Sequence, residues 1–349
     1  MYFLRAVQTS SSALPSGKLR GTQQRKRHPT TKAKTAKNAF SIAMKVGLSI
    51  DLVAVLTAVT DGEPQVMTIS GGSALPSGPF ELDDRSLQSG LRAWVERQTG
   101  RPLGYLEQLY TFADRDRVGE GSSRRVISIS YLGLTREERA DGNSGAGWHS
   151  WYDYFPWEDR RLRTPAFVDR TMIPRLRAWV KAAEDPAKRL ERAERLNVSY
   201  GLDGSAWNEE LILQRYELAF EAGIIEEALR TGPAQKALVP GRAMTGDHRR
   251  ILATGIARLR AKIKYRPVVF ELMPATFTLL QLQRTVEALA GHLLHKPNFR
   301  RLIEQQELVE ETGATASDVP GRPAKLYRFR RGVLAERAIA GTKLPLVRP

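Results

Sequence analysis

Charged side chains with the spacing of a catalytic box occur in residues 78–100, GPFELDDRSLQSGLRAWVERQTG. Asp84 is the sixth residue after Gly78, and Arg92 is the eighth residue after Asp84. Several carboxylates on one helix face can hold Mg²⁺ ions against a pyrophosphate and help to deprotonate the attacking water. In this stretch Glu96 is followed by Arg97, whose positive charge would repel a metal ion. The acids of this stretch are therefore too few, and too close to an arginine, to hold Mg²⁺ in this way.

The stretch resembles the Nudix box, Gly-x5-Glu-x7-Arg-Glu-U-x-Glu-Glu-x-Gly, in which U is a bulky aliphatic residue. Counted from Gly78, the paired glutamates of the box become Glu96 and Arg97. Counted back from Gly100, they become Arg97 and Gln98. At most one paired carboxylate remains in either frame, so the resemblance implies a Nudix fold that binds a nucleotide without hydrolysing it. An amphipathic helix with a chance glycine spacing is an equal alternative for the box alone.

Residues beyond the box could contact the nucleotide. The loop ADRDRVGEGSSRR, residues 113–125, carries arginines that could meet a diphosphate, with an ordinary solvated loop as the alternative. The segment WHSWYDYFPW, residues 148–157, holds six aromatic residues that could stack on a base, although packing in the interior is favoured. The candidate ligand-binding residues are Arg97, Tyr110, Asp114, Arg115, Arg117 and Trp151.

The last hundred residues predict a winged helix-turn-helix. Apolar residues recur at helical spacing in residues 246–267, 277–291 and 296–306, and two strand-like runs follow at 308–313 and 324–330. The second helix should begin with a capping box, because Thr278 stands three positions before a glutamine. A basic helical bundle that does not contact DNA is the alternative.

The third of these helices is the candidate reader of DNA. Phe299, Leu302 and Ile303 should pack inward. Amide and guanidinium side chains should then face outward, where they could reach phosphates and base edges. An arginine at the tip of the loop between the two strands could add a further contact. The candidate DNA-binding residues are Thr278, Gln281, Lys296, Asn298, Arg300, Arg301, Gln305, Arg322 and Lys325.

Basic charge is concentrated at the two ends of the 349-residue chain. The net charge of +16 divides into +9 for residues 1–38, −4 for residues 39–240 and +11 for residues 241–349. Such a distribution is expected when separate parts face a polyanion. The chain has no cysteine, which excludes disulfides and thiolate metal sites, and it has no apolar run of membrane-spanning length. We therefore expect a cytoplasmic protein without a membrane partner.

Strand-like and helical runs divide the chain into an α+β fold. Strands are predicted over 49–59, 65–70, 104–112 and 125–134, and helices over 174–196 and 205–230. In the last helix Leu211, Leu218 and Ile225 recur every seven residues, as a dimer seam or as core. The expected parts are a disordered basic tail (1–38), a Nudix-like mixed-sheet sandwich (39–160), a helical linker or dimerisation region (161–240), a winged helix-turn-helix (241–335) and a C-terminal tail (336–349).

The two halves together resemble the Nudix-related transcriptional regulators of NAD metabolism, the NrtR type. The runs FTLLQLQ, NFRR and GRPAKLYRF carry the resemblance, GYLEQLYTFADRDR adds to it, and the matches cover roughly residues 45–135 and 240–335. The longer chain and extended middle look closest to the alphaproteobacterial NadQ type. The resemblance implies a non-catalytic nucleotide sensor that controls binding to the operators of NAD biosynthesis genes.

The sequence therefore predicts a homodimeric, nucleotide-responsive repressor that needs no cofactor. Its partners would be an operator in double-stranded DNA and an adenine nucleotide effector: NAD, ADP-ribose or ATP. The alternative is an active Nudix pyrophosphatase of the ADP-ribose or NAD type with an appended nucleic-acid-binding domain. A purely structural DNA-binding protein is a third possibility, and weak residual hydrolysis stays open. The effector, the sign of its effect and the operator sequence do not follow from the residues.

Overall fold

The computed structural model describes residues 49–100, 102–113, 126–136, 145–230, 239–264, 268–316, 323–330 and 332. Its strands are β1 (Ser49–Thr60), β2 (Glu63–Thr68), β3 (Ser77–Pro79), β4 (Tyr105–Phe112), β5 (Val126–Leu134), β6 (Gly147–Ser150), β7 (Val309–Ala316) and β8 (Ala324–Phe329). Its α-helices are α2 (Leu87–Thr99), α3 (Trp151–Tyr154), α4 (Ile173–Lys181), α5 (Pro186–Tyr200), α6 (Ile212–Glu221), α7 (His248–Ile263), α8 (Leu279–Ala290) and α9 (Lys296–Gln305). Shorter 3₁₀ or π turns are η1 (Ser70–Gly72), η3 (Pro156–Glu158), η4 (Val168–Met172), η5 (Glu209–Leu211), η6 (Glu226–Leu229) and η7 (Val268–Leu272).

A mixed sheet built around β1 forms the centre of the described chain. The strand order is β4-β5-β1-β2-β6, and β3 pairs with β1 outside this path. The β1–β5 pair is parallel, whereas the other neighbours are antiparallel. The β1 run SIDLVAVLTAVT is almost continuously apolar, as expected for a strand with both faces covered. The four strands predicted from the sequence are β1, β2, β4 and β5.

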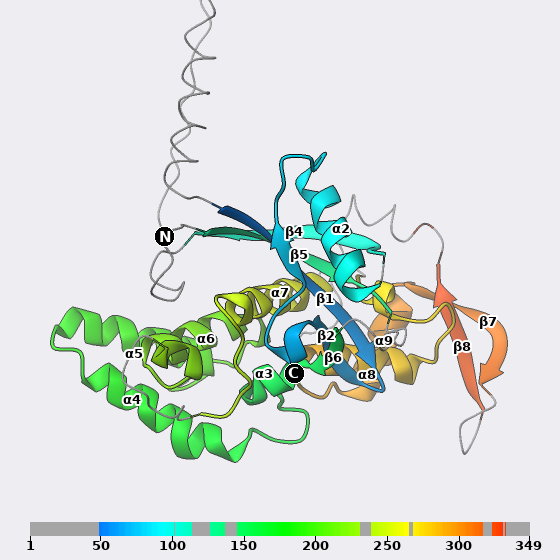
Figure 1. Ribbon diagram of the computed structural model, residues 1–349. Coiled ribbons are helices and arrows are strands. Elements are labelled where there is room, and N and C mark those ends of the chain that lie inside the picture. The colour runs from blue at the N-terminus through cyan, green and yellow to red at the C-terminus, as the bar shows by residue number, and fades with distance from the viewer. Residues whose placement is uncertain are drawn as a thin grey trace, which may run out of the picture. The chain divides into compact units, whose positions relative to one another are not determined.

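Helices cover both faces of this sheet (Figure 1). Alternate residues of β1 point to opposite faces, so Leu52 and Ala54 pack in the core under α2, whereas Val53 and Val55 pack in the larger core that α7 and α8 share. Helix α7 approaches the sheet closely at Gly255, where an added Cβ would lie 2.8 Å from a methyl carbon of Val55. The residue without a side chain thus sets the distance between α7 and β1.

The middle of the chain is helical as predicted, but the helices are shorter. The predicted helix over 174–196 is two helices, α4 and α5, because Asp185 caps a new helix whose first residue is Pro186. The predicted helix over 205–230 is a 3₁₀ turn, the helix α6 and another 3₁₀ turn. Leu218 and Ile225 of the heptad pattern are 1% exposed within the chain's own core, which is the core interpretation and not the dimer seam.

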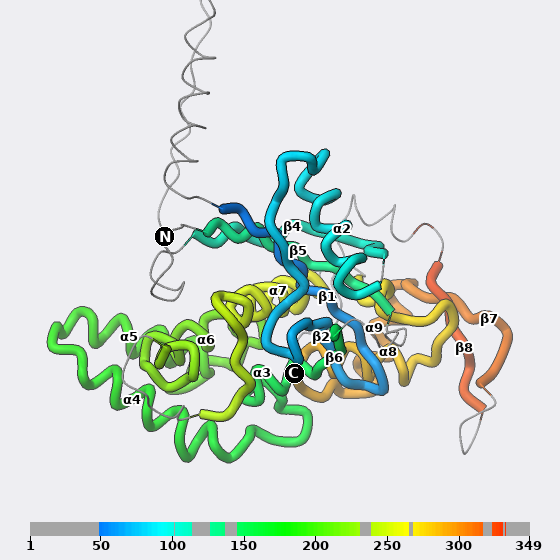
Figure 2. Tube along the Cα trace, viewed as in Figure 1, coloured from blue at the N-terminus to red at the C-terminus, as the bar shows by residue number. Residues whose placement is uncertain are grey.

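The C-terminal part forms a winged helix. Helices α8 and α9 are followed by the antiparallel ribbon β7–β8, which Figure 2 shows extending from the end of the α8–α9 pair. Phe277, directly before α8, exchanges two backbone hydrogen bonds with Tyr327 of β8 and so fastens the ribbon to the helix. The helix predicted over 246–267 exists as α7, but it packs on the sheet and on α6.

One hydrophobic core joins the sheet, the middle helices and the winged helix. It contains Val55 of β1, Tyr216 of α6, Leu259 of α7 and Leu282 of α8. The predicted fold class is therefore confirmed: a mixed sheet between helices, a helical region and a C-terminal winged helix. Among the residues placed by the structure, every helix is too short or too polar to cross a bilayer.

Candidate functional site

Helix α9 presents one anchored face and one open face. Phe299 and Ile303 are at most 2% exposed, and Pro297 occupies the first turn, where a missing N–H costs no helical hydrogen bond. The polar side chains predicted to face outward all lie on the exposed surface of the helix: Lys296, Asn298, Arg300, Arg301 and Gln305. A helix held by two apolar anchors with guanidinium and amide groups outside has the form required to enter a major groove.

The exposed arginines of α9 differ from the basic side chains of the ribbon. Within the described part of the chain, Arg300 and Arg301 take part in no ion pair. On β8, in contrast, the Nζ of Lys325 lies 2.8 Å from a carboxylate oxygen of Glu311, and Arg328 pairs with β7 in the same way. The guanidinium groups of α9 can therefore bind phosphate or guanine without first giving up a carboxylate.

Two of the candidate DNA-binding residues have a structural task at the start of α8. The hydroxyl of Thr278 accepts the backbone N–H of Gln281 at 3.2 Å, and the Gln281 side chain accepts the N–H of Thr278 at 2.7 Å. This is the predicted capping box. Thr278 is only 7% exposed, so its hydroxyl serves the helix cap, whereas Gln281 is exposed. Arg322 lies outside the described residues.

The box is a loop and a helix held together by side chains that replace carboxylates. Trp94 lies against Gly78, where an added Cβ would be 2.2 Å from the indole, and its Nε1 donates to the carbonyl of Pro79 at 2.9 Å. Gln98 donates to the carbonyl of Ser77 at 2.7 Å and accepts its N–H at 3.0 Å. Gly78 is needed for close contact with Trp94, and Gln98 fixes the loop to α2 by its two hydrogen bonds to Ser77.

The remaining acids of the box do not form a metal site. A carboxylate oxygen of Asp84 accepts the backbone N–H of Glu81 at 3.0 Å, and Glu96 is exposed on α2. The guanidinium of Arg92 donates to the carbonyls of Leu103 and Gly104. No cluster of three or more His, Cys, Asp or Glu side chains that could hold a metal occurs among the residues described above.

The candidate nucleotide-binding residues are in different surroundings. The guanidinium of Arg97 lies 3.9 Å above the Trp94 ring, and its Nε donates to the carbonyl of Ala93 at 3.2 Å. Tyr110 on β4 is 60% exposed and meets the ring of Phe112 edge-on at 5.1 Å. Both side chains are open to a ligand.

The proposal that Trp151 stacks on a base is wrong for this arrangement, because the side chain is 1% exposed and packs in the core. The aromatic segment is a packing element, which was the favoured alternative. Asp114, Arg115 and Arg117 lie outside the described residues.

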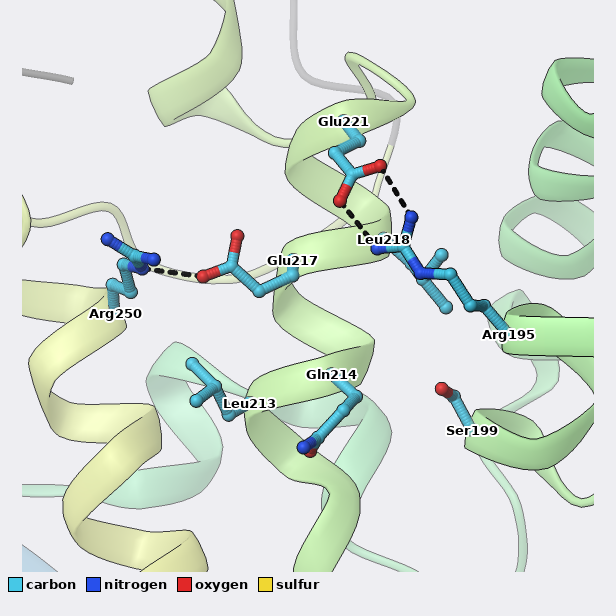
Figure 3. Close-up of a pocket in the computed structure, with 8 residues that line it drawn as sticks. All are labelled: Arg195, Ser199, Leu213, Gln214, Glu217, Leu218, Glu221 and Arg250. Atoms are coloured by element: carbon cyan, nitrogen blue, oxygen red, sulfur yellow. Dashed lines mark hydrogen bonds and ion pairs between the residues drawn. The ribbon is translucent and has the colours of Figure 1, made fainter. Parts of the chain in front are cut away.

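A hollow of about 440 Å³ lies between α5, α6 and α7 (Figure 3). Its charged walls are already paired: Arg195 binds both carboxylate oxygens of Glu221, at 2.5 and 3.0 Å, and Arg250 lies 2.5 Å from Glu217. None of the predicted ligand-binding residues lines it. Its internally neutral lining gives no sign of a phosphate site.

A buried charge cluster that was not predicted from the sequence joins the middle of the chain to α7. Glu158 accepts hydrogen bonds from the Nε of Arg215 at 2.5 Å and from the Nη1 of Arg260 at 2.6 Å, and all three side chains are at most 1% exposed. Burial alone would raise the pKa of Glu158, but the two arginines lower it below its ordinary value. The cluster's one local sign in the sequence is an arginine on the apolar face of α6, Arg215, and another on that of α7, Arg260.

Comparisons with known proteins identify the C-terminal part. The family model described as the NrtR DNA-binding winged helix domain matches residues 269–329. Over 84 residues the chain is 44% identical to the ADPR responsive transcriptional repressor NtrR of Acinetobacter baylyi, which is 24% of this chain and a third (33%) of that protein.

Solved structures also match, at low identity. NrtR of Shewanella oneidensis complexed with a 27mer DNA is 19% identical, covering 82% of this chain and 95% of the other, with a TM-score of 0.49. The NUDIX domain of the same protein complexed with ADP ribose is 23% identical over 36% of this chain and 86% of the domain, with a TM-score of 0.30. The segment that matches the NrtR DNA-binding winged helix model, residues 269–329, has the exposed arginines of α9 at its centre.

Proposed function

We propose that the chain is a dimeric transcriptional repressor. The part built on the sheet β1–β6, called the sheet half below, would sense ADP-ribose, and the winged helix would bind operators of NAD biosynthesis genes. The observation that carries the proposal is α9, with Arg300 and Arg301 exposed and free of ion pairs within the described residues. The family of the winged helix supports DNA as the partner. The name of the Acinetobacter relative supports ADP-ribose over NAD and ATP. A NadQ-like subtype stays a prediction.

Binding to DNA is tested by changing the two exposed arginines of α9 one at a time. The base-reading arginine, replaced by alanine, should lose about 1–3 kcal/mol on the operator and relax preference at one base pair. The phosphate-binding one should weaken all sequences alike and reduce the salt dependence by about one counterion. Fluorescence anisotropy with labelled promoter fragments over a salt series gives both quantities for Arg300→Ala and Arg301→Ala.

The matched control is Arg175→Ala, which removes an arginine that is also exposed but lies on α4, outside the winged helix. It should bind the operator as the unchanged protein does. If both α9 variants also bind as the unchanged protein does, at a salt concentration where binding is not saturated, α9 is not the reader and the proposed function fails.

The sheet half would bind the nucleotide without cleaving it. In the box, position 97 is an arginine stacked on a tryptophan and position 98 is an amide hydrogen-bonded to the loop, so neither supplies a carboxylate for Mg²⁺. Incubation with ADP-ribose and Mg²⁺ or Mn²⁺ should give no AMP above background. Turnover on the order of one per second would instead indicate the pyrophosphatase alternative.

The effector can be identified from its effect on stability. A ligand that binds only the native state raises the melting temperature, so ADP-ribose should raise it more than NAD, ATP or nicotinamide mononucleotide do. We also propose that Arg97, Tyr110, Asp114, Arg115 and Arg117 contact the ligand. Replacing Arg115 and Arg117 together by alanine should weaken ADP-ribose binding and leave DNA affinity without ligand unchanged, as measured by calorimetry and anisotropy.

A further inference from the structure

The C-terminal end of α8 is held by donors from outside the winged helix. The hydroxyl of Tyr152 donates to the carbonyl of Ala288 at 2.6 Å, and the Nε of Arg260 donates to the carbonyl of Leu289 at 2.8 Å. The backbone N–H of Arg160 donates to the carbonyl of Gly291 at 2.7 Å. The last carbonyls of a helix have no partner within the helix, so outside donors must satisfy them. Here those donors come from the segment after β6 and from α7.

Further hydrogen bonds hold the side chain of Arg260, the donor on α7, in its orientation. The Nη1 of Arg260 also donates to a carboxylate oxygen of Glu158 at 2.6 Å and to the carbonyl of Glu209 at 2.8 Å. Rotation of Arg260 would separate its buried guanidinium from Glu158, which would stay paired with Arg215. An uncompensated buried charge is costly, so the cluster fixes Arg260, and with it the end of α8.

The donors on the other segment are tied to the sheet. Tyr152 lies in α3, two residues after Ser150, the last residue of β6, which is paired with Gln65 of β2. In the same segment Arg161 donates to the carbonyl of Gly62, in the turn between β1 and β2, at 2.8 Å. A displacement of β2 or β6 therefore moves residues 150–161, and these carry two of the three contacts to α8.

Helix α8 in turn carries the DNA-binding helix. Only residues 292–295 separate Gly291 from α9, and α8 packs against α9 in the winged helix. The three carbonyls are thus one place, besides the packing of α8 on β1 and β2, where the position of the sheet is passed to α9. The ligand-binding half needs such a connection if a nucleotide is to shift the protein between two arrangements with different DNA affinity.

We propose that Tyr152 and Arg260 are positioning residues that couple ligand binding by the sheet half to the orientation of α9. The proposal rests on the proposed function, because it requires that ADP-ribose change DNA affinity. Neither residue touches DNA in this proposal; each acts through a carbonyl of α8. Their loss should therefore weaken the communication between the two ligands more than the binding of either one.

The test compares two tyrosines, Tyr152 half-buried and Tyr154 buried, whose hydroxyls each donate to a backbone carbonyl. Tyr152→Phe removes the donor to Ala288 of α8, whereas the control Tyr154→Phe removes a donor to the carbonyl of Gly72, 2.7 Å away and within the sheet half. For each full-length variant, operator affinity is measured by anisotropy without and with saturating ADP-ribose. ADP-ribose affinity without DNA is measured by calorimetry.

The quantity of interest is the ratio of operator affinities without and with ADP-ribose. Tyr154→Phe should keep the ratio of the unchanged protein. Tyr152→Phe should bring it closer to one by about threefold or more, since an intramolecular hydrogen bond typically contributes up to roughly tenfold in an equilibrium constant. ADP-ribose affinity should stay within about twofold in both variants. An unchanged ratio in Tyr152→Phe overturns the coupling proposal alone. If the unchanged protein shows no response to ADP-ribose, the proposed function fails first, and the coupling proposal fails with it.

Hydrogen exchange on the unchanged protein gives a second test that needs no variant. The amide of Arg160 is protected by the carbonyl of Gly291, so its exchange rate reports the contact between the two halves. Addition of ADP-ribose should change the exchange of the peptide that contains Arg160. If ADP-ribose changes operator affinity while exchange in this peptide stays the same, the coupling runs elsewhere and the proposal is wrong, whether or not Tyr152→Phe folds.

Discussion

Replacing Glu158 by glutamine should destabilise the protein strongly. The carboxylate is 1% exposed. Its two oxygens accept hydrogen bonds from the Nε and Nη2 of Arg215, at 2.5 and 2.9 Å, and one of them also accepts a hydrogen bond from the Nη1 of Arg260, at 2.6 Å. Glutamine has nearly the same shape but no charge, and one of its two ends is a donor. The variant would therefore leave two buried guanidinium groups without the carboxylate that pairs with them, and one of them facing an NH₂ group.

The expected magnitude follows from burial. Removing one partner of a buried ion pair costs about 3–5 kcal/mol. Glu221 is the matched control, because it accepts Arg195 at the same closest distance, 2.5 Å, but both side chains are 37% exposed. An exposed pair contributes roughly 0.2–1 kcal/mol, so Glu221→Gln should cost much less. Both substitutions remove the charge of one glutamate, and the sites differ in burial and in the number of arginines bound, two at Glu158 and one at Glu221.

Urea unfolding followed by circular dichroism measures the difference. With a slope of about 3 kcal/mol/M, Glu158→Gln should lower the midpoint by about 1–1.7 M, and Glu221→Gln by no more than about 0.3 M. The slopes should stay equal, so that the midpoints report stability. Equal midpoint shifts in the two variants, or a shift below 0.3 M for Glu158→Gln (about 1 kcal/mol at this slope), would refute the assignment of the buried cluster as a major contributor to stability.

Three further predictions concern stability. His248 accepts the backbone N–H of Leu75 at 2.9 Å through Nδ1, and burial lowers its pKa to about 4. Between pH 6.5 and 4 the unfolded chain binds the extra proton, so stability is full above pH 6.5 and falls by about 2–3 kcal/mol towards pH 4. His248→Gln should reduce this fall in urea titrations across the pH range. Gly255→Ala, normally favourable in a helix, should lower the free energy of unfolding by about 1–2 kcal/mol, because the added methyl clashes with Val55. The same substitution should cost less when it is made in a Val55→Ala variant. Thr278→Ala should cost about 1 kcal/mol of unfolding free energy through loss of the α8 cap, and Ser, which keeps the hydroxyl, should restore it.

Local patterns in the sequence predicted the parts of the structure that depend on neighbouring residues. The apolar run of β1, the capping box of Thr278 and the inward anchors Phe299 and Ile303 are set by spacing within one element, and the structure has them as expected. The exposed side chains of α9 follow from the same spacing. The winged helix and its candidate DNA-binding surface could therefore be read from the sequence.

Contacts between distant segments could not be predicted in this way. An amphipathic pattern shows that α7 has a buried face, but not that the sheet covers it. An aromatic residue such as Trp151 suits a ligand pocket and a core equally well, and only its 1% exposure decides between them. In the Glu158 cluster, Arg215 is 57 positions and Arg260 is 102 positions from Glu158 along the chain. Over such separations the spacing of residues carries no information about contacts.

The packing of α8 limits how the DNA-binding part can be exchanged or isolated. Helix α8 lies against β1 and β2 as well as against its own ribbon, and its inner residues belong to the core of the sheet half. A fragment cut before residue 269 would expose that apolar face to water and should aggregate. Chimaeras made from this protein and a relative would need to carry the matching surfaces of β1, β2 and α7 along with the winged helix. Operator specificity is therefore better transferred by grafting the outward residues of α9 than by exchanging the whole domain.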